Sequence, residues 1–282
     1  MHTHRTGWVT LIAMLAFAGN SLLCRAALRD THIDPASFTA LRIVSGALVL
    51  WLIVRWRHGT RAAPVHGNWV SALALFAYAA TFSYAYVSLS TGTGALLLFG
   101  AVQATMIGVG WWRGERLASV QFAGLAIACA GLVGLLLPGL SAPPLAAALL
   151  MLASGIAWGI YSLRGKSAGD PTRVTAGNFL RASLPAALLL LAHIPRLQLD
   201  GRGMVYAIAS GALTSGMGYV IWYAALRTLR PATASTVQLS VPAIAAMGGT
   251  LLLAEPLTAR LVLASATILG GIALVILRKP TR

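Results

Sequence analysis

The sequence predicts an all-α membrane protein in which ten transmembrane helices form two inverted five-helix repeats. Of its 282 residues, 58% are hydrophobic and only 10% are charged, and the mean hydropathy is +0.79. A soluble domain of this size would need a polar surface that this composition cannot supply. The chain also resembles itself at an offset of about 140 residues, which indicates an internal repeat.

Ten apolar stretches can be marked, and most have the roughly 20 residues that a helix needs to cross the hydrocarbon core. They lie at roughly 8–24, 36–54, 69–89, 94–112, 119–137, 145–163, 175–194, 204–226, 233–253 and 260–277. With their short connections they use nearly the whole chain and leave no room for a soluble catalytic domain. The first stretch has a polar centre, Gly19–Ser21, which favours an uncleaved helix over a signal peptide.

The internal repeat is clearest after the fourth and the ninth stretch. There Gly114–Leu117 (Gly-Glu-Arg-Leu) corresponds to Ala254–Leu257 (Ala-Glu-Pro-Leu), and Gly131 and Gly271 follow the two glutamates at the same distance. Five spans are an odd number, so two such repeats in tandem must enter the bilayer in opposite orientations. This is the plan of many secondary transporters, which bind their substrate between the repeats near the middle of the bilayer.

One short turn rich in Pro, Gly and Ser, Pro138–Pro144, joins the fifth and sixth stretches and is the boundary that the sequence indicates. We therefore expect a first repeat at residues 1–138, a linker at 139–143 and a second, inverted repeat at 144–282. The other connections are short as well, so neighbouring helices should pack antiparallel.

The basic residues are distributed unequally between the two sides of the predicted membrane domain. Fourteen of the 21 Lys and Arg residues lie on the side that both termini share, and five lie on the opposite side. The positive-inside rule therefore places both termini in the cytoplasm, and we expect a multi-pass protein of the bacterial inner membrane. The same rule accounts for the net charge of +15, so no nucleic-acid partner is expected.

The sequence shows no signature of a metal site or of a cofactor. Cys24 and Cys129 lie inside apolar stretches without metal-ligand spacing, and the glycines form no phosphate-binding loop after a strand. An intramembrane enzyme would need paired acidic residues, a histidine cluster or a Ser–His arrangement at membrane depth, and none is visible. We expect no metal, no cofactor and no enzymatic activity.

The acidic residues all lie in loops or at the ends of the stretches. They are Asp30, Asp34, Glu115, Asp170, Asp200 and Glu255. Proton-driven antiporters usually carry a carboxylate or a histidine inside the membrane. Because the six histidines also lie near the ends, we predict no midplane proton carrier and expect facilitated diffusion by alternating access. Glu115 and Glu255 are interpreted as local partners for loop arginines and helix ends.

These features together resemble a known family. Its pattern is seen in Gly19-Asn20 of the first stretch, Arg42 of the second, the turn Gly114–Leu117, its counterpart Ala254–Leu257, and Pro242 of the ninth stretch. The chain resembles the EamA domain of the drug/metabolite transporter superfamily over essentially all ten spans. Its aromatic content is similar to that of the bacterial exporters of aromatic amino acids and paraquat. The resemblance implies export of small metabolites, above all amino acids with aromatic side chains; cationic drugs and nucleotide sugars are the alternatives.

Aromatic residues mark one candidate surface for such a substrate. Tyr78, Phe82 and Tyr86 recur every four residues in the third stretch and share one helix face. That face could line a cavity, or it could lie against lipid and headgroups. In the sixth stretch, Trp158 and Tyr161 lie beside two glycines, where a close helix approach would turn the Trp158 ring inward.

Polar residues inside the stretches complete the candidate site. Gln103 shares a helix face with Phe99, and Asn20, Asn178 and Gln238 are further intramembrane amides. Each could bind an ammonium or a carboxylate, or could hold helices together. A small-molecule site needs apolar walls with a few convergent polar groups. The predicted substrate-binding set is therefore Asn20, Tyr78, Phe82, Tyr86, Phe99, Gln103, Trp158, Tyr161, Asn178 and Gln238.

Three further residues are candidates for a gate or a hinge. Arg42 and Arg181 are repeat equivalents about two turns from a span end, so they either extend to the headgroups or act in gating or packing. Pro242 interrupts the ninth stretch, as a hinge or as a static kink; Val102-Gln103 replaces the corresponding family proline in the fourth. The expected partners are a small-molecule substrate and the lipid bilayer, and we expect a monomer.

Overall fold

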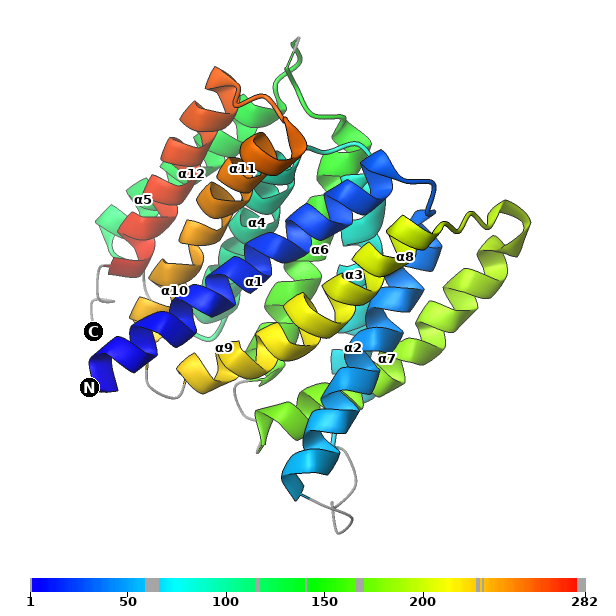
Figure 1. Ribbon diagram of the computed structural model, residues 1–282. Coiled ribbons are helices and arrows are strands. Elements are labelled where there is room, and N and C mark those ends of the chain that lie inside the picture. The colour runs from blue at the N-terminus through cyan, green and yellow to red at the C-terminus, as the bar shows by residue number, and fades with distance from the viewer. Residues whose placement is uncertain are drawn as a thin grey trace.

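The protein is all-helical in the part of the chain that its structure describes. The computed structural model describes residues 2–58, 66–114, 117–139, 141–165, 170–226, 229 and 231–277, with the backbone alone at 2–5, 58, 231, 232 and 235. Within these ranges every regular element is a helix, and the helices form one bundle (Figure 1). This confirms the predicted all-α membrane fold.

The ten predicted spans correspond to helices or to interrupted helices. The first five are α1 (His2–Asp30), α2 (Pro35–His58), α3 (Trp69–Tyr86), α4 (Thr91–Trp112) and α5 (Ser119–Leu136). The sixth is α6 (Leu145–Gly165), the seventh is α7 (Pro171–His193, followed by η2, Ile194–Arg196), and the tenth is α12 (Ala259–Leu277). The eighth span consists of α8 (Gly201–Ala209), η3 (Ser210–Met217) and α9 (Gly218–Leu226). The ninth consists of α10 (Pro231–Gln238) and α11 (Ser240–Leu253).

Length and hydropathy alone mark nine membrane-crossing helices among the described residues, and α3 is the span that they leave out. Its serine, threonine and tyrosine residues lower the hydropathy of a helix that is nevertheless as long as α5. Those polar side chains belong to the interior of the bundle, since Ser71, Tyr78, Ser83 and Tyr86 are buried. A span that borders a polar site is thus less apolar than one that faces lipid.

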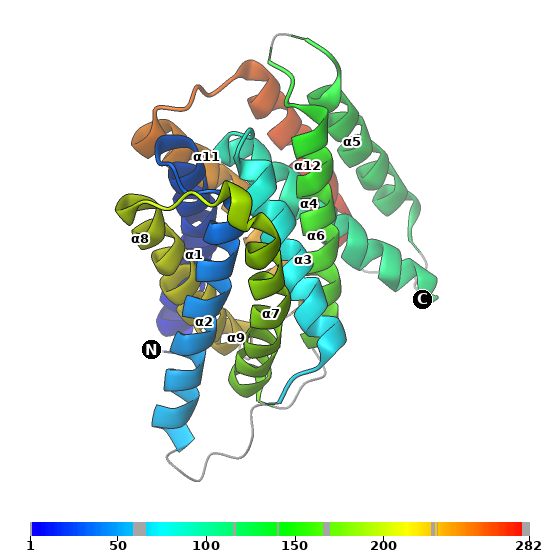
Figure 2. The ribbon, with the colours of Figure 1, turned by 90° about the vertical axis from the view of Figure 1, so that its right-hand side faces the viewer.

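The helix pairs repeat when the two halves of the chain are exchanged. Helix α3 packs on α6 as the eighth span packs on α1, and α4 packs on α6 as α11 packs on α1. Three pairs are unchanged when the two halves are exchanged: α2 with α7, α4 with α11, and α5 with α12. The α5–α12 pair forms one flank of the bundle (Figure 2). This symmetry is what two inverted five-helix repeats produce.

Glycines allow the closest approaches between helices. A Cβ atom on Gly124 of α5 would lie 2.6 Å from the carbonyl oxygen of Gly271 of α12. On α6, a Cβ atom on Gly155 would overlap the carbonyl oxygen of Leu98, and one on Gly159 would lie 2.9 Å from Thr105. The contacts on α6 are the close approach predicted for the glycines beside Trp158. At all these positions the helix backbones could not come so close with side chains between them.

The eighth span contains a π-helical segment, η3, that the sequence did not reveal. It packs against α2 so closely that a Cβ atom on Gly211 would overlap the Arg42 carbonyl oxygen and the Ser45 hydroxyl. Segments of π-helix inside α-helices occur often at functional sites. Here the segment carries Ser210 and Ser215, whose hydroxyls bond to α1 and α2 respectively.

The ninth span is broken, as its proline predicted. Helix α10 ends at Gln238 and α11 begins at Ser240, with Leu239 between them in a turn. Pro242 has no N–H, so the Gln238 carbonyl loses its usual helical partner. By contrast, α7 continues through Pro185. The kink is therefore a feature of the structure, while its movement as a hinge stays a prediction.

The close contact between η3 and α2 leads to a prediction on stability. We expect Gly211→Ala to lower the thermal unfolding temperature of the purified protein in detergent, because the added methyl group overlaps the α2 backbone. Overpacking of this kind costs about 1–3 kcal/mol. The matched control is Gly108→Ala on α4, where a Cβ atom meets nothing within 4 Å. Equal unfolding temperatures for the two variants would contradict this account of the η3–α2 contact.

Candidate functional site

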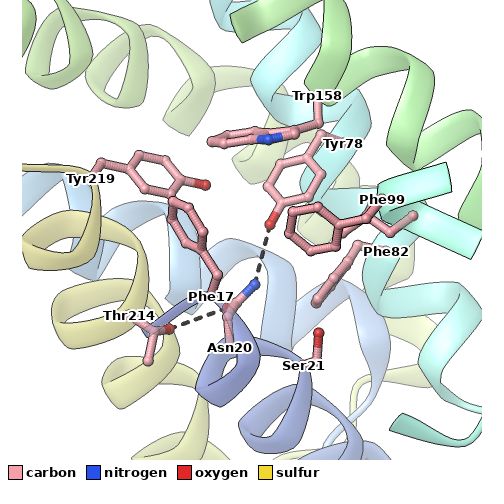
Figure 3. A pocket seen from close by; sticks show the side chains of 10 residues that line it. Phe17, Asn20, Ser21, Tyr78, Phe82, Phe99, Trp158, Thr214 and Tyr219 are labelled. Atoms are coloured by element: carbon pink, nitrogen blue, oxygen red, sulfur yellow. Dashed lines mark hydrogen bonds between the residues drawn. The ribbon is translucent and has the colours of Figure 1, made fainter. Parts of the chain in front are cut away.

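A small cavity lies in the middle of the bundle, between helices of both halves. Its walls are Phe17, Asn20 and Ser21 of α1, Tyr78 and Phe82 of α3, Leu98 and Phe99 of α4, Trp158 of α6, Thr214 of η3 and Tyr219 of α9 (Figure 3). Its volume is about 20 Å³, which is room for about one water molecule. In this conformation the side chains fill the space that a metabolite would need.

The walls of the cavity are mainly aromatic, and the rings contact one another. The Trp158 ring lies 4.9 Å from that of Tyr78 and 4.9 Å from that of Tyr219, between centroids, and 6.4 Å from that of Phe17. Tyr78 and Phe82 are 5.5 Å apart. Rings at these separations attract one another, so the cluster is stable when empty. The flat ring of a ligand could replace one of these ring–ring contacts by a contact with itself.

Asn20 is the polar centre of the cavity. Its Nδ2 donates a hydrogen bond to the Tyr78 hydroxyl at 3.1 Å, and its Oδ1 accepts from Thr214 at 3.3 Å (Figure 3). The same Oδ1 accepts from Ser210 at 2.7 Å. One amide thereby ties α1 to α3 and to the π-helical part of the eighth span. Water is scarce at this depth, so the polar groups find their partners inside the protein.

Arg42 lies directly behind Tyr78 and is only 2% exposed. Its Nη2 donates to the Tyr78 hydroxyl at 2.6 Å, and its Nε donates to Ser215 at 3.3 Å. The guanidinium carbon also lies 5.0 Å from the ring centre of Tyr78 and 4.9 Å from that of Phe82, within the range of a cation–π contact. The alternative that Arg42 extends to the headgroups is therefore wrong, because its head is held inside the bundle.

Five of the ten predicted site residues are brought together at the cavity. They are Asn20, Tyr78, Phe82, Phe99 and Trp158. The stripe on α3 faces inward throughout, since Tyr78, Phe82 and Tyr86 are all at most 4% exposed, which rules out a lipid-facing stripe. The two glycines beside Trp158 make the predicted close approach to α4, and the ring reaches the cavity.

The other five predicted residues do not line this cavity. Tyr161 stacks behind Trp158 at 5.4 Å, and Tyr86 packs on Phe82 at 4.7 Å. Gln103 is buried one turn beyond Phe99. Asn178 accepts from the backbone N–H of Asn68 at 3.0 Å, and Gln238 ends α10. Arg181, a candidate for a gate, is half-buried and donates to the Gly177 carbonyl of its own helix. Contact of any of them with a substrate stays a prediction.

The predicted set left out several residues of the eighth span, two of α1 (Phe17 and Ser21) and Leu98 of α4. Thr214 and Tyr219 line the cavity, Ser210 and Ser215 bond to its polar groups, and Phe17 closes it from α1. The signal in the eighth span was the group of hydroxyl residues one turn before an aromatic residue. Phe17 likewise lies one turn before Asn20.

One end of the bundle is closed by a buried acidic residue, Glu255. Its Oε1 accepts from Arg25 Nε at 3.0 Å and lies 3.9 Å from Arg29 Nη1, and its Oε2 accepts from the N–H of Thr91, the first residue of α4, at 2.7 Å. Glu255 thus has an arginine and a helix end as partners, as predicted, but Arg25 and Arg29 lie in α1, which continues past the predicted span, and not in a loop. Glu115, the repeat equivalent of Glu255, lies outside the described residues.

Arg25 and Arg29 also donate hydrogen bonds to the connections between other helices at the same end. Arg25 Nη1 donates to the carbonyls of Tyr86 and Val87 at 2.9 Å each, and Arg29 Nη1 donates to that of Leu253 at 2.8 Å. The cluster thus joins the end of α1 to the α3–α4 and α11–α12 connections. We call Arg25, Arg29 and Glu255 the end cluster.

Two aspartates tie loops together at this end. Asp34, ahead of α2, accepts from Ser37 and from the Gln198 backbone, and Asp200, ahead of α8, accepts from the His32 backbone. Burial opposes ionisation of Asp34, but the hydrogen bonds from Ser37 and Gln198 outweigh it and lower the pKa of its carboxyl. The backbone N–H of Gly203 lowers the pKa of Asp200. Both are therefore ionised at neutral pH and hold the loops together.

The fold is that of a multi-span membrane protein with a small cavity between its two halves. A model of the EamA-like transporter family matches residues 6–137 and again residues 145–277. The chain belongs to this family, and it acts on small molecules within the bilayer as the family does.

Relatives match the chain over nearly its whole length. "Uncharacterized protein PA1977" of Pseudomonas aeruginosa is 59% identical over 276 residues, 98% of this chain and 96% of the relative. An "Uncharacterized transporter" of Archaeoglobus fulgidus is 25% identical over 96% of this chain and 99% of its own. A solved structure described as "Crystal structure of protein" has a TM-score of 0.66 at 21% identity, covering 96% of this chain and 98% of its own, and shows the fold alone.

The end cluster can be tested with the native cysteines. Cys24 is fully buried, one residue from Arg25, and Cys129 is exposed on α5. In a Cys129→Ala background we expect Glu255→Gln to speed labelling of Cys24 by a water-soluble maleimide about tenfold or more. Removing one partner of a buried ion pair costs about 3–5 kcal/mol and would open this end.

The control for this labelling experiment is Asp30→Asn. Asp30 pairs with Arg29 in the same region, but both side chains are about one-third exposed, and exposed pairs contribute little. We expect this variant to label Cys24 at the unmodified rate. Equal rates for the two variants would show that Glu255 does not keep this end closed.

Proposed function

We propose that the protein exports small metabolites across the bacterial inner membrane, with amino acids that carry aromatic side chains as the preferred substrates. The observation that supports this most is the cavity between the two halves, whose walls are Phe17, Tyr78, Phe82, Trp158 and Tyr219, with Asn20 as a central polar group. Aromatic walls favour a flat ring, and the amide can bond to the polar end of such a molecule.

Transport by alternating access fits the closed state of this cavity. At about 20 Å³ it holds no amino acid, so the helices around it must separate before a substrate enters. The end cluster closes one side in this conformation. In our proposal the repeats at 1–138 and 144–282, joined by 139–143, rock against each other. Pro242, Arg42 and Arg181 are the candidates for hinge and gate in this movement.

The orientation in the membrane follows from the basic residues. The fourteen Lys and Arg residues on the side of the termini support cytoplasmic N- and C-termini. Helix α1 begins at that side and ends at the end cluster, so the end cluster faces the periplasm in this proposal. The conformation described is then closed to the periplasm.

The proposed driving force is the substrate gradient, so that transport is facilitated diffusion. The described residues that line the cavity include no carboxylate and no histidine, and Glu255 is held by Arg25 and by the start of α4. A proton-coupled carrier needs a group in its site that changes charge. We propose that the substrate gradient alone drives transport, by a monomer.

The charge of Arg42 bears on the two alternative substrate classes. A cationic drug such as a flat dication would meet the positive charge of this residue behind Tyr78. A nucleotide sugar would meet a single buried arginine there, because Arg181 bonds to its own helix away from the cavity. Arg42 thus favours a substrate with a single negative group, which an amino acid supplies.

The proposal is tested in proteoliposomes. We expect saturable uptake of labelled tryptophan and phenylalanine, weaker uptake of threonine, and no change when a proton gradient is imposed. Uptake that needs the gradient would contradict facilitated diffusion. No uptake of any amino acid would contradict the proposed substrates and would favour the drug or nucleotide-sugar alternative.

The role of the aromatic walls leads to a separate prediction. We expect Trp158→Ala to weaken uptake of tryptophan, measured as the half-saturating concentration, by about tenfold, because one stacked ring contributes up to about 1.5 kcal/mol beyond its buried area. Trp112→Ala on α4 is the control, since Trp112 is 88% exposed at the bundle surface. A loss of the same size in both variants would argue against stacking in the cavity.

A further inference from the structure

Arg42 is a buried cation to which the described part of the protein supplies no anion. A guanidinium stays ionised in proteins, so the charge cannot be removed by deprotonation. Asp30 and Glu255 form ion pairs with Arg25 and Arg29, and no described carboxylate forms one with Arg42. A fixed charge in the middle of a membrane domain is costly and tends to mark a ligand or ion site.

The hydrogen bonds of Arg42 are incomplete. Nη2 donates to Tyr78 and Nε to Ser215, but Nη1 is buried and has no hydrogen-bond partner among the described residues. A buried donor that is left unpaired costs free energy, and more so when it is charged. Neighbouring rings of Tyr78 and Phe82 offset part of this cost through their faces, but they accept no hydrogen bond in the plane of the guanidinium. The side chain thus keeps a binding capacity that this conformation does not use.

The Tyr78 hydroxyl occupies the place that a ligand oxygen would take. It lies 2.6 Å from Arg42 Nη2 and 3.1 Å from Asn20 Nδ2, so one oxygen accepts from a cation and from an amide. Tyr78 is also a wall of the cavity, and its ring lies between the cavity and the guanidinium. If this ring turns aside, Nη1, Nη2 and the Asn20 amide become free donors. Two parallel N–H groups of a guanidinium match the two oxygens of a carboxylate.

We propose that Arg42 binds the carboxylate of the substrate, and that the Tyr78 hydroxyl takes its place when the substrate is absent. This inference rests on the proposed function, because it concerns the same cavity. It narrows the substrate class to molecules with an aromatic group and one carboxylate. Since the described cavity walls carry no acidic residue, an ammonium group adds no ion pair, and a simple aromatic acid binds at least as well as the amino acid.

The proposal is tested first on the unmodified full-length protein with three probes of one shape. They are 3-phenylpropionate, which has the carboxylate alone, L-phenylalanine, which has carboxylate and ammonium, and phenethylamine, which has the ammonium alone. Binding is measured by calorimetry at pH 7 in detergent. We expect phenethylamine to bind at least about tenfold more weakly than 3-phenylpropionate, as befits the loss of a buried charged hydrogen bond.

Variants then assign this preference to Arg42. We expect Arg42→Gln to abolish the difference between 3-phenylpropionate and phenethylamine, and Arg42→Lys to keep its direction with weaker binding. Arg55→Gln, which removes the same group from an exposed position of the same helix, should keep the full preference. Tyr78→Phe should bind 3-phenylpropionate severalfold more tightly, because the competing hydroxyl is gone; a purely structural role for the Arg42–Tyr78 bond predicts no gain.

The outcomes separate this proposal from the proposed function. Equal binding of phenethylamine and 3-phenylpropionate to the unmodified protein would overturn the role of Arg42, even if liposomes still transport phenylalanine. Binding of 3-phenylpropionate that depends on Arg42, without transport of any amino acid, would support the role of Arg42 and overturn amino-acid export. Should Arg42→Gln fail to fold, the probe series and Arg42→Lys decide. Binding of none of the probes would overturn the proposal.

Discussion

The structure depends on one constraint, that polar groups inside a membrane domain must find partners within the protein. The chain meets it with a connected set of side chains around Tyr78, whose hydroxyl accepts from Asn20 and from Arg42. Ser210 and Ser215 extend the set to the eighth span. Four spans are thereby held at one depth and in one rotation. The aromatic rings pack around this polar set, so the position of the cavity follows from it.

Close backbone contacts make this arrangement of the polar set geometrically feasible. A serine hydroxyl is short, so Ser215 reaches Arg42 only because Gly211 lets η3 lie directly on the α2 backbone. The π-helical turn brings Ser210 toward α1 and Ser215 toward α2 from a single segment. Glycine on α6 does the same for Trp158, since Gly155 lies against the α4 backbone and the ring beside it reaches the cavity. Small residues here position large ones.

The sequence predicted most spans well because a helix that faces lipid must be apolar, and hydropathy measures this property. The fifth stretch, expected at 119–137, is Ser119–Leu136, and the sixth, expected at 145–163, is Leu145–Gly165. Helix α1 is longer than its apolar stretch, because hydropathy does not register its polar ends. What the sequence could not give is the rotation of each helix about its axis, since lipid-facing and buried sides are both apolar and an amphipathic pattern is weak.

That limit explains which parts of the site were predicted and which were not. Tyr78 and Phe82 stood out because a regular aromatic stripe defines a face by itself. Helix α9 also carries several aromatic residues, Tyr219, Trp222 and Tyr223, but their pattern was not used to predict a face. The direction of Arg42 depends on Tyr78 and Ser215, which come from two other spans, so its position near a span end suggested the headgroups instead. Contacts over such separations are fixed by tertiary packing and leave no local pattern.

Helix α1 connects the cavity with the closed end of the bundle. Asn20 holds the polar set, and Arg25 and Arg29 hold the end cluster through Glu255. Five residues of helix separate Asn20 from Arg25, a rise of about 7.5 Å along one rigid element. A movement of α1 that breaks the bonds of Arg25 also shifts Asn20 relative to Tyr78. In a transporter that works by alternating access, opening of this end and rearrangement of the site are therefore mechanically linked through one helix.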